Sequence, residues 1–285
     1  MLSGNSQKTR ILLVYPPVDP IGVGGRFNVV DVYQPLGLAY IAAVLEKAGY
    51  EVRIIDAKVE PLSVEQIIKK TADFNPQIVG FSFSTLDFHI TKRLAQGLKS
   101  CGNYTVIIGG PHVSALPEET MQEECFDYGV IGEGERTTIE LVDALCQGRK
   151  EAIPAIRGIA FRDGLRVIRT PEQAYIEDLD SIPFPARHLL PDVKRYRYSW
   201  YKYLPTATII TSRGCPYQCT FCDRAVFGNK LRMRSVENII DEIEMLVKEY
   251  GVRGVNILDV LFTISSERIE AFCQQLISRK LRVSR

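Results

Sequence analysis

The chain has 285 residues, of which 46% are hydrophobic and 24% are charged, and its formal net charge is +1. This length suits about two domains, and a charge near zero gives no reason to expect a nucleic-acid or anionic-membrane partner. No apolar run reaches the ~18 residues of a spanning helix, and residues 1–10 lack the apolar core of a signal peptide. Seven cysteines, three of them clustered, favour the reducing cytoplasm over a disulfide framework.

Strand and helix patterns alternate through the first half of the chain. Short apolar runs that end at a proline, aspartate or glycine predict strands, and the amphipathic stretches between them predict helices. Strands that alternate with helices form a doubly wound parallel sheet, whose ligands lie at the carboxyl ends of the strands. We therefore assign residues 1–150 to a Rossmann-like α/β domain. The predicted strands are 11–15, 52–55, 78–81, 106–108 and 128–131, and the predicted helices are 36–48, 64–72, 90–98 and 137–146.

Residues 151–204 read as a hairpin followed by a linker. An Asp-Gly turn at residues 163–164 lies between two short apolar runs, which predicts a β-hairpin over 158–168. The aromatic and basic stretch 195–203 resembles segments that stack nucleic-acid bases. Because the net charge is near zero, we favour a loop between domains or facing a substrate for this stretch.

Three cysteines with the spacing Cys-x3-Cys-x2-Cys follow the predicted strand 208–211; they are Cys215, Cys219 and Cys222. Ser235 then caps a predicted helix, and 255–258 predicts the next strand. The triplet therefore lies on a strand-to-helix loop, where the active sites of α/β barrels are built. Three thiolates on one loop can hold a cubane iron–sulfur cluster that keeps one iron free of protein ligands.

The alternatives for this triplet are a zinc knuckle or three buried cysteines. Zinc normally takes four ligands, and no fourth Cys or His is near in the sequence. His188 is distant, and Cys273 lies in a helical pattern. The cluster interpretation is therefore preferred.

The cysteine spacing, with Phe221 before the last cysteine, closely resembles the radical S-adenosylmethionine superfamily. The resemblance implies a 4Fe–4S cluster on Cys215, Cys219 and Cys222, with S-adenosylmethionine chelated at the open iron and cleaved by one electron to a 5′-deoxyadenosyl radical. It also implies an electron donor such as flavodoxin or ferredoxin. Phe221 would lie near the adenine, and Asp259, at the end of the second barrel strand, would hold the ammonium group. The alternative for Asp259 is an ordinary acidic residue in solvent.

The loops of the first half together resemble the cobalamin-binding domain that precedes many radical S-adenosylmethionine enzymes. The matching stretches are 35–43, 54–57, 79–82, 109–112, 132–135 and the link 179–187. The resemblance implies a cobalamin-dependent enzyme that transfers a methyl group to an unactivated centre of a small-molecule substrate. The residues it points to for cobalamin are Asp56, Ser82, Ser84, Thr85, Gly109, Gly110, His112, Glu133 and Gly134.

One departure from the cobalamin pattern bears on the cobalt. In the Asp-x-His-x-x-Gly motif of cobalamin mutases and methionine synthase the histidine ligates cobalt, whereas here Lys58 takes its place and Pro61 replaces the glycine. A protonated lysine is a poor metal ligand. We therefore expect cobalamin with its nucleotide tail displaced and no histidine below the cobalt. His112 offers a contact to a corrin amide, although a lone loop histidine is more often a surface residue.

The end of the chain predicts the start of a third barrel strand at 281–283, where the family barrel has about six strand–helix units. We therefore expect an incomplete barrel over 205–285, an open sheet edge and poor turnover. Two other functions stay open: a ring-forming cyclase of the magnesium-protoporphyrin ester type, and a non-enzymatic cobalamin- or cluster-binding fragment. Radical methylthiolation of tRNA is disfavoured because it needs a second cysteine triplet in the first domain. Cys101, Cys125 and Cys146 do not form one.

Overall fold

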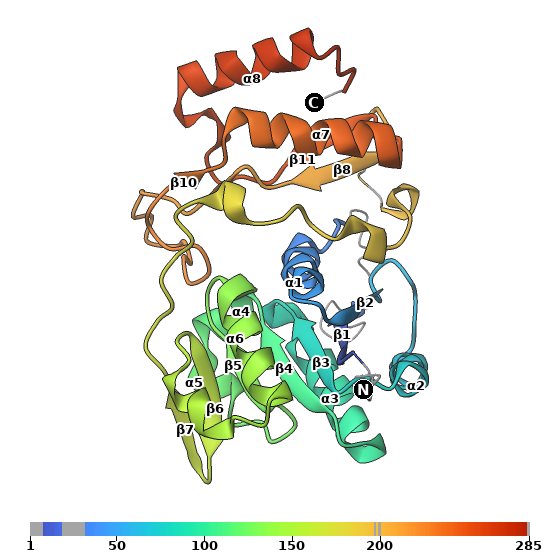
Figure 1. Cartoon of the computed structure of the whole chain (residues 1–285), viewed down its shortest axis with the longest axis vertical. Helices are drawn as coiled ribbons and strands as arrows, with labels where there is room; N and C mark the ends of the chain where they lie inside the picture. The colour runs from blue at the N-terminus through green and yellow to red at the C-terminus, as the bar shows by residue number, and fades with distance from the viewer. Residues whose placement is uncertain (1–7, 19–31, 197, 199–200, 284–285) are drawn as a thin grey trace, which may run out of the picture.

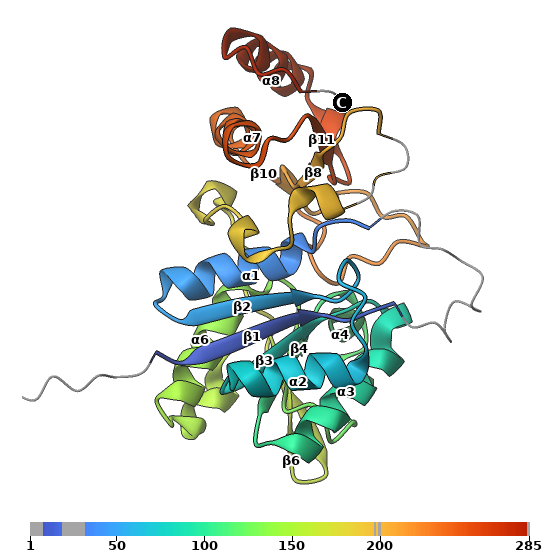
Figure 2. The ribbon, with the colours of Figure 1, turned by 90° about the vertical axis from the view of Figure 1, so that its right-hand side faces the viewer.

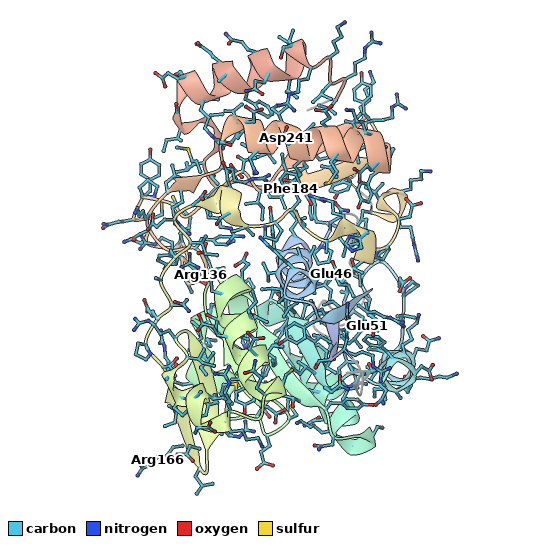
Figure 3. The ribbon with its side chains drawn as sticks, viewed as in Figure 1. Glu46, Glu51, Arg136, Arg166, Phe184 and Asp241 are labelled. Atoms are coloured by element: carbon cyan, nitrogen blue, oxygen red, sulfur yellow. The ribbon has the colours of Figure 1, made fainter. Side chains whose placement is uncertain are left out.

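The computed structural model describes residues 8–18, 32–196, 198 and 201–283. Two α/β parts lie one above the other along the long axis of the molecule (Figure 1). The larger part contains a seven-stranded sheet, and the smaller part contains β8, β11, α7 and α8. The segment that follows the last strand of the large sheet runs between the two parts, and Phe184 lies on it (Figure 3).

The large sheet has the strand order β2-β1-β3-β4-β5-β6-β7. Its first five strands are parallel, and the hairpin β6–β7 is antiparallel to them. The hairpin predicted from the Asp-Gly turn is thus present and extends the sheet of the first domain. The strands are β1 Arg10–Tyr15, β2 Glu51–Asp56, β3 Ile78–Ser82, β4 Thr105–Gly109, β5 Tyr128–Val130, β6 Ile159–Asp163 and β7 Arg166–Arg169.

Helices cover both faces of this sheet, which confirms the doubly wound α/β prediction. Their bounds are α1 Leu36–Lys47, α2 Val64–Phe74, α3 Phe88–Cys101, α4 Pro111–Ala115, α5 Pro117–Thr120 and α6 Gly134–Cys146. The sequence patterns missed α4 and α5, which are only 5 and 4 residues long. Single 3-10 turns occupy Thr85–Asp87, Lys150–Ala155, Leu179–Ser181, Arg187–Leu189, Val193–Arg195 and Phe262–Ile264.

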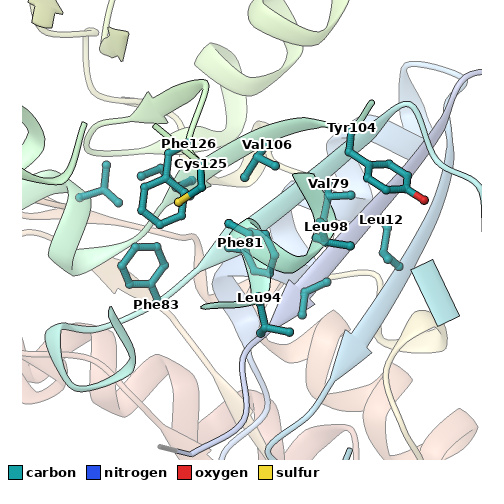
Figure 4. Packing of buried hydrophobic residues seen from close by; sticks show 14 of the residues in the cluster. Leu12, Val79, Phe81, Phe83, Leu94, Leu98, Tyr104, Val106, Cys125 and Phe126 are labelled. Atoms are coloured by element: carbon teal, nitrogen blue, oxygen red, sulfur yellow. The ribbon is translucent and has the colours of Figure 1, made fainter. Parts of the chain in front are cut away.

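Each face of the sheet has its own apolar core. On the face covered by α2 and α3, Val79 and Phe81 pack against Leu94 and Leu98 (Figure 4). On the other face, α1 and α6 contribute Leu38 and Leu141 among others. Burial of aliphatic side chains on both faces is typical of parallel sheets, because helices cover each side.

The smaller part holds the predicted strand–loop–helix unit around the cysteines. Strand β8, Thr206–Ile209, pairs in parallel with β11, Gly254–Ile257. Helix α7, Val236–Tyr250, begins at Ser235, whose side chain accepts a hydrogen bond from the Asn238 amide. Two short strands, β9 Ser212–Arg213 and β10 Arg232–Met233, form an antiparallel pair at the base of the cysteine loop.

Helix α8, Ser266–Ser278, packs against α7, and the predicted third strand after it is absent from residues 281–283. Lys280 adopts a left-handed conformation with φ of 52°, and the Leu281 amide bonds back to the Leu276 carbonyl. The chain is therefore still closing the helix where the strand was expected.

Candidate functional site

A cavity of about 630 Å³ lies between the sheet of the first domain and the cysteine loop, residues 214–231. Figure 2 shows this loop reaching from the smaller part toward the ends of the sheet strands. The first domain lines the cavity with Tyr15, Ser82, Ser84, Gly109, Gly110, Gly132, Glu133 and Gly134. The smaller part adds Arg213, Gly214, Cys215, Cys222, Leu258 and Val260, among others. Its volume is within the range of cofactor sites in proteins.

The cavity also extends under α1 and α6, along one face of the sheet. Leu13, Gly80 and Ile107 line it from the strands, and Leu38, Ile41 and Val142 line it from the helices. A Cβ at Gly80 would lie 2.7 Å from the Leu13 side chain, so the glycine allows Leu13 to pack closely against the strand there. The sequence analysis missed this channel, although a glycine in the middle of a buried strand is a signal of close approach.

Gly109 and Gly110 end β4 at the mouth of the channel. Gly110 has φ of 96°, and a Cβ there would lie 2.8 Å from the Ser82 Oγ and 2.9 Å from the Phe83 carbonyl oxygen. The position therefore favours glycine both by conformation and by space. Ser82 and Ser84 line the cavity beside these glycines, so four of the predicted residues are brought together.

His112 is buried, so its preferred interpretation as a surface residue is wrong. Its side chain is about 5% exposed and packs on the rings of Phe83 and Phe88, with centroids 5.6 and 4.8 Å away. Its Nδ1 lies 3.1 Å from the hydroxyl of Thr85. Burial lowers the pKa of His112. Helix α4 turns the ring into the core, and neither His112 nor Thr85 is among the residues that line the cavity.

Asp56, which is buried, and Lys58, which is partly buried, form a polar group at the end of β2. The Asp56 carboxylate accepts hydrogen bonds from the Lys58 amide at 3.1 Å and from the Tyr196 hydroxyl at 2.9 Å. The Lys58 ammonium lies 2.9 Å from Asp87 and 4.4 Å from the centre of the Tyr15 ring. Asp87 also accepts a hydrogen bond from the Ser84 hydroxyl. Lys58 is thus charged and held in place at the position where a cobalt-binding histidine would stand.

Tyrosines of the aromatic stretch 195–203 contact the first domain, beginning with Tyr196 and its bond to Asp56. The Tyr198 ring packs edge-on against Tyr33 and Tyr201, with centroids 5.2 and 5.7 Å away. Residues 197, 199 and 200 lie outside the described part of the chain. The described tyrosines join the linker to the first domain, as the interpretation of a loop between domains expects.

The cysteine loop places two of its three thiols at the cavity. Cys215 and Cys222 line it and Cys219 does not; Cys219 and Cys222 are both exposed, and none of the three forms a disulfide. The Cys215 amide donates to the Gly228 carbonyl at 3.3 Å, and the Cys222 amide to the Cys219 carbonyl at 3.1 Å. The Phe221 side chain is 91% exposed. Within the described residues, no three His, Cys, Asp or Glu side chains are grouped to hold a metal ion, and this includes the three cysteines, so the cluster site stays a prediction.

Gly214, which joins β9 to the first cysteine, sits in a confined place. It has φ of 83°, and a Cβ there would lie 2.1 Å from the Lys230 carbonyl oxygen. Any larger residue would push apart the two ends of the loop. The absence of a side chain at Gly214 therefore allows the start of the cysteine loop to lie against its end at Lys230.

Asp259 holds the turn between β8 and β9. Its Oδ1 accepts from the Thr211 amide at 2.6 Å and from the Ser212 amide at 3.1 Å. Its Oδ2 accepts from the hydroxyls of both residues. Both oxygens are thus engaged by the backbone that leads into the cysteine loop, and the predicted contact with an ammonium group stays a prediction.

Glu133 lines the cavity, but its carboxylate pairs with two arginines of the smaller part. Arg213 Nη1 lies 3.2 Å from Glu133 Oε1, and Arg232 Nη1 lies 2.7 and 2.9 Å from the two carboxylate oxygens. Glu135 pairs with Arg213 at 2.5 Å. The sequence analysis missed these pairs, which join residues about 80 to 100 positions apart. The one signal in the sequence was that an arginine stands at each end of the loop.

Comparisons with known proteins agree with this architecture. Residues 23–142 match the B12 binding domain, and residues 209–283 match the radical SAM superfamily. A relative from Pyrococcus horikoshii, described as an uncharacterized methyltransferase, is 37% identical over 91% of this chain and 55% of its own length. The anaerobic magnesium-protoporphyrin IX monomethyl ester cyclase of Rubrivivax gelatinosus is 32% identical over 96% of this chain and 49% of its own length.

Two solved structures share the fold. The cobalamin-dependent S-adenosylmethionine radical enzyme OxsB superposes with a TM-score of 0.80 at 22% identity, covering 98% of this chain and 38% of that one. The radical S-adenosylmethionine methyltransferase TsrM from Kitasatospora setae gives 0.72 at 20% identity, covering 96% and 51%. The chain spans about half the length of the curated relatives it matches.

No helix in the described part of the chain is long and apolar enough to cross a membrane. The order of the two matched regions agrees with the order of the two parts of the fold, and both contribute to one cavity. The chain is a member of the radical S-adenosylmethionine superfamily, in the group of enzymes that carry a B12-binding domain ahead of the radical domain.

Proposed function

We propose that this chain forms the cobalamin-binding and cluster-binding part of an enzyme that transfers a methyl group to an unactivated centre of a small molecule. One observation carries the proposal. Cys215 and Cys222 line the same cavity as Ser84 and Gly110, so the predicted cluster site and the predicted cobalamin site face one cavity. Methyltransferases among the relatives support this choice of reaction.

The chemistry of the donor groups suits both cofactors, with three thiols on one loop for a cluster and glycines beside serine hydroxyls for cobalamin. Cys215, Cys219 and Cys222 would hold a 4Fe–4S cluster, and the mouth formed by Ser82, Ser84 and Gly110 would take cobalamin. The apolar channel beside Gly80 offers room for a displaced nucleotide tail. When bound, the cluster supplies one electron to cleave S-adenosylmethionine, and cobalamin supplies a metal that can carry a methyl group.

The protein's own groups prepare this space in two ways. Lys58, paired with Asp87 and lying over the ring of Tyr15, which lines the cavity, puts a cation in place of the motif histidine. The walls of the channel are largely aliphatic, and charge interactions inside would strengthen when a bound cofactor displaces water. The exposed side of the cysteine loop, at Cys219, is where a flavodoxin or ferredoxin would approach.

A ring-forming cyclase is the second candidate. The observation that favours it is the similarity to magnesium-protoporphyrin IX monomethyl ester cyclases from three organisms, at 29–32% identity. Both candidates use the same cavity, so the choice depends on the substrate.

Anaerobic reconstitution with iron and sulfide tests the cluster. We expect uptake of about four irons per chain and an electron paramagnetic resonance signal from the reduced protein that changes with S-adenosylmethionine. Cys219→Ala should lose the signal, whereas Cys101→Ala, an exposed thiol of the first domain, should keep it. Stoichiometric zinc without iron, or a full signal in Cys219→Ala, would reject the assignment.

Titration with cobalamin tests the other cofactor. We expect a change in the corrin absorption spectrum and, in the cobalt(II) form, no superhyperfine splitting from a protein nitrogen. His112→Ala should leave that spectrum unchanged, because His112 lies outside the cavity lining. Failure to bind at high micromolar cobalamin would count against the cobalamin part alone.

A further inference from the structure

Two arginines mark the ends of the cysteine loop. Arg213 in β9 directly precedes Gly214, and Arg232 in β10 directly follows the loop. The two strands are paired antiparallel, with Arg213 opposite Arg232. Their side chains therefore start from adjacent positions, and both reach the first domain.

Two carboxylates of the first domain meet these arginines. Glu133 precedes α6 and Glu135 lies in its first turn, where the helix dipole favours negative charge. Arg213 bonds both carboxylates, and Arg232 bonds both oxygens of Glu133. All four residues are only 4–6% exposed. We call these four residues the charge clamp; their formal charges cancel.

Further hydrogen bonds tie Glu133 and Arg232 of the clamp to neighbouring segments. The Ile176 amide donates to Glu133 at 2.8 Å, while Arg232 Nη1 donates to the Ile176 carbonyl at 2.9 Å. Arg232 Nη2 donates to the Phe227 carbonyl, inside the cysteine loop, at 2.9 Å. The Tyr175 ring lies 4.8 Å from the Arg232 guanidinium carbon. Three segments far apart in the chain are thus bonded through one buried group.

The clamp also forms part of the cavity wall. Arg213, Glu133 and Glu135 line the cavity together with Cys215 and Cys222. A Cβ on Gly132 would lie 3.7 Å from the Val226 carbonyl, so the two backbones are close here as well. Both Glu133 oxygens are bonded within the clamp, so this carboxylate links the two parts of the molecule. Its predicted contact with cobalamin stays a prediction.

We infer that Glu133, Glu135, Arg213 and Arg232 are positioning residues that hold the cysteine loop at a fixed place over the cobalamin cavity. The inference rests on the proposed function for its purpose, but the contacts themselves do not. Buried ion pairs add little net stability compared with apolar packing, yet removing one partner is costly. A buried ionic group of this kind fixes the position of the loop more than it stabilises the fold. Two cofactors that act on one substrate need such a fixed relative position.

The apo protein provides the first test. Arg213→Gln and Glu135→Gln should each raise, by about tenfold, the amide exchange of residues 214–231 and the alkylation rate of Cys215. Cys101, exposed in the first domain, should keep its rate. Glu177→Gln is the matched control, because it removes a partner of Lys230 in the same loop where both side chains are more than 60% exposed. Unchanged exchange in both single variants would overturn the inference.

The double variant Arg213→Gln/Glu135→Gln separates position from stability. Removing both charges leaves no unpaired ion, so we expect its Tm to recover relative to the single variants. Loaded with cobalt(II) cobalamin and a reduced cluster, it should still show an altered magnetic interaction between the two centres. Recovery of both the Tm and the wild-type line shape would show a purely structural role and overturn the inference. If the wild type takes up neither cofactor, the proposed function fails, while the exchange result still decides the clamp.

Discussion

The sheet of the first domain and the cysteine loop are held in place by different forces. The sheet buries aliphatic side chains on both faces, so its stability comes from area removed from water. The cysteine loop has few buried apolar residues. It is held by ion pairs, by backbone hydrogen bonds and by two glycines in confined places, Gly214 and Gly228. Apolar packing tolerates small adjustments, whereas directional bonds favour one arrangement. The molecule thus combines a stable frame with a precisely placed loop.

The largest effect is expected where charge joins the parts. Glu242 of α7 is fully buried and pairs with Arg187 of the linker and Arg234 of the smaller part; Arg187 also bonds Gln34 of the first domain. Glu242→Leu leaves two buried arginines without this partner and should lower the free energy of unfolding by about 3–5 kcal/mol. Urea unfolding measures it. Glu237→Gln on the same helix, 71% exposed and paired with Arg279, should cost less than about 1 kcal/mol.

The apolar frame should respond differently. Leu94 is fully buried in the core beneath α3, and Leu94→Ala should lower stability by about 2–5 kcal/mol. Amide exchange in residues 214–231 should stay as in the wild type under native conditions. If Leu94→Ala also raised amide exchange in residues 214–231, the stability of the sheet and the position of the cysteine loop would not be independent.

Gly110 directly follows β4 of the sheet and also lines the cavity that the cysteine loop faces. Gly110→Ala places a methyl group 2.8 Å from the Ser82 Oγ in a backbone conformation that disfavours it. We expect a loss of about 1–3 kcal/mol and weaker cobalamin binding, by roughly tenfold or more. Gly148→Ala is the control, since Gly148 has φ of 68° but nothing within 4 Å of an added Cβ. Equal binding in the two variants would remove Gly110 from the proposed mouth.

The smallest expected effect is on how the Tm depends on pH below neutrality. Burial holds the folded-state pKa of His112 below its usual 6.5, so the folded state binds fewer protons there than the unfolded state. This histidine therefore destabilises the fold progressively as pH falls through the window below 6.5, and not above it. His112→Phe should flatten the loss of Tm between pH 7.5 and pH 5.5. An identical slope in the variant would mean that other groups set the acid response.

Local patterns predicted the frame well. Ser63 forms a capping box with Gln66 at the start of α2, and Ser235 caps α7, as their positions before apolar stripes indicated. The burial of His112 was not predictable in this way, because it depends on α4, a helix of only five residues. The three cysteines could be proposed as a site because the pattern lies within a short stretch of sequence, and their role as cluster ligands stays a prediction.

The clamp could not be predicted from such patterns. Arg213 and Glu135 are separated by 78 positions, and nothing local to either one names its partner. Charged residues in short strands usually face solvent, so a buried pair between domains goes against the usual expectation. Only the fold, which brings the first turn of α6 to the base of the cysteine loop, reveals it.

The clamp has a consequence for dividing the protein into its two parts. A cut before β8 leaves Glu133 and Glu135 at a helix start, where water can solvate them at little cost. The same cut strips Arg213 and Arg232 of every carboxylate partner found in the structure. The released fragment would carry two adjacent like charges at the root of its cysteine loop, and these would repel each other. When the halves are expressed as separate chains, we therefore expect the half that carries the cysteine loop to be destabilised, and co-expression with the first half to restore it.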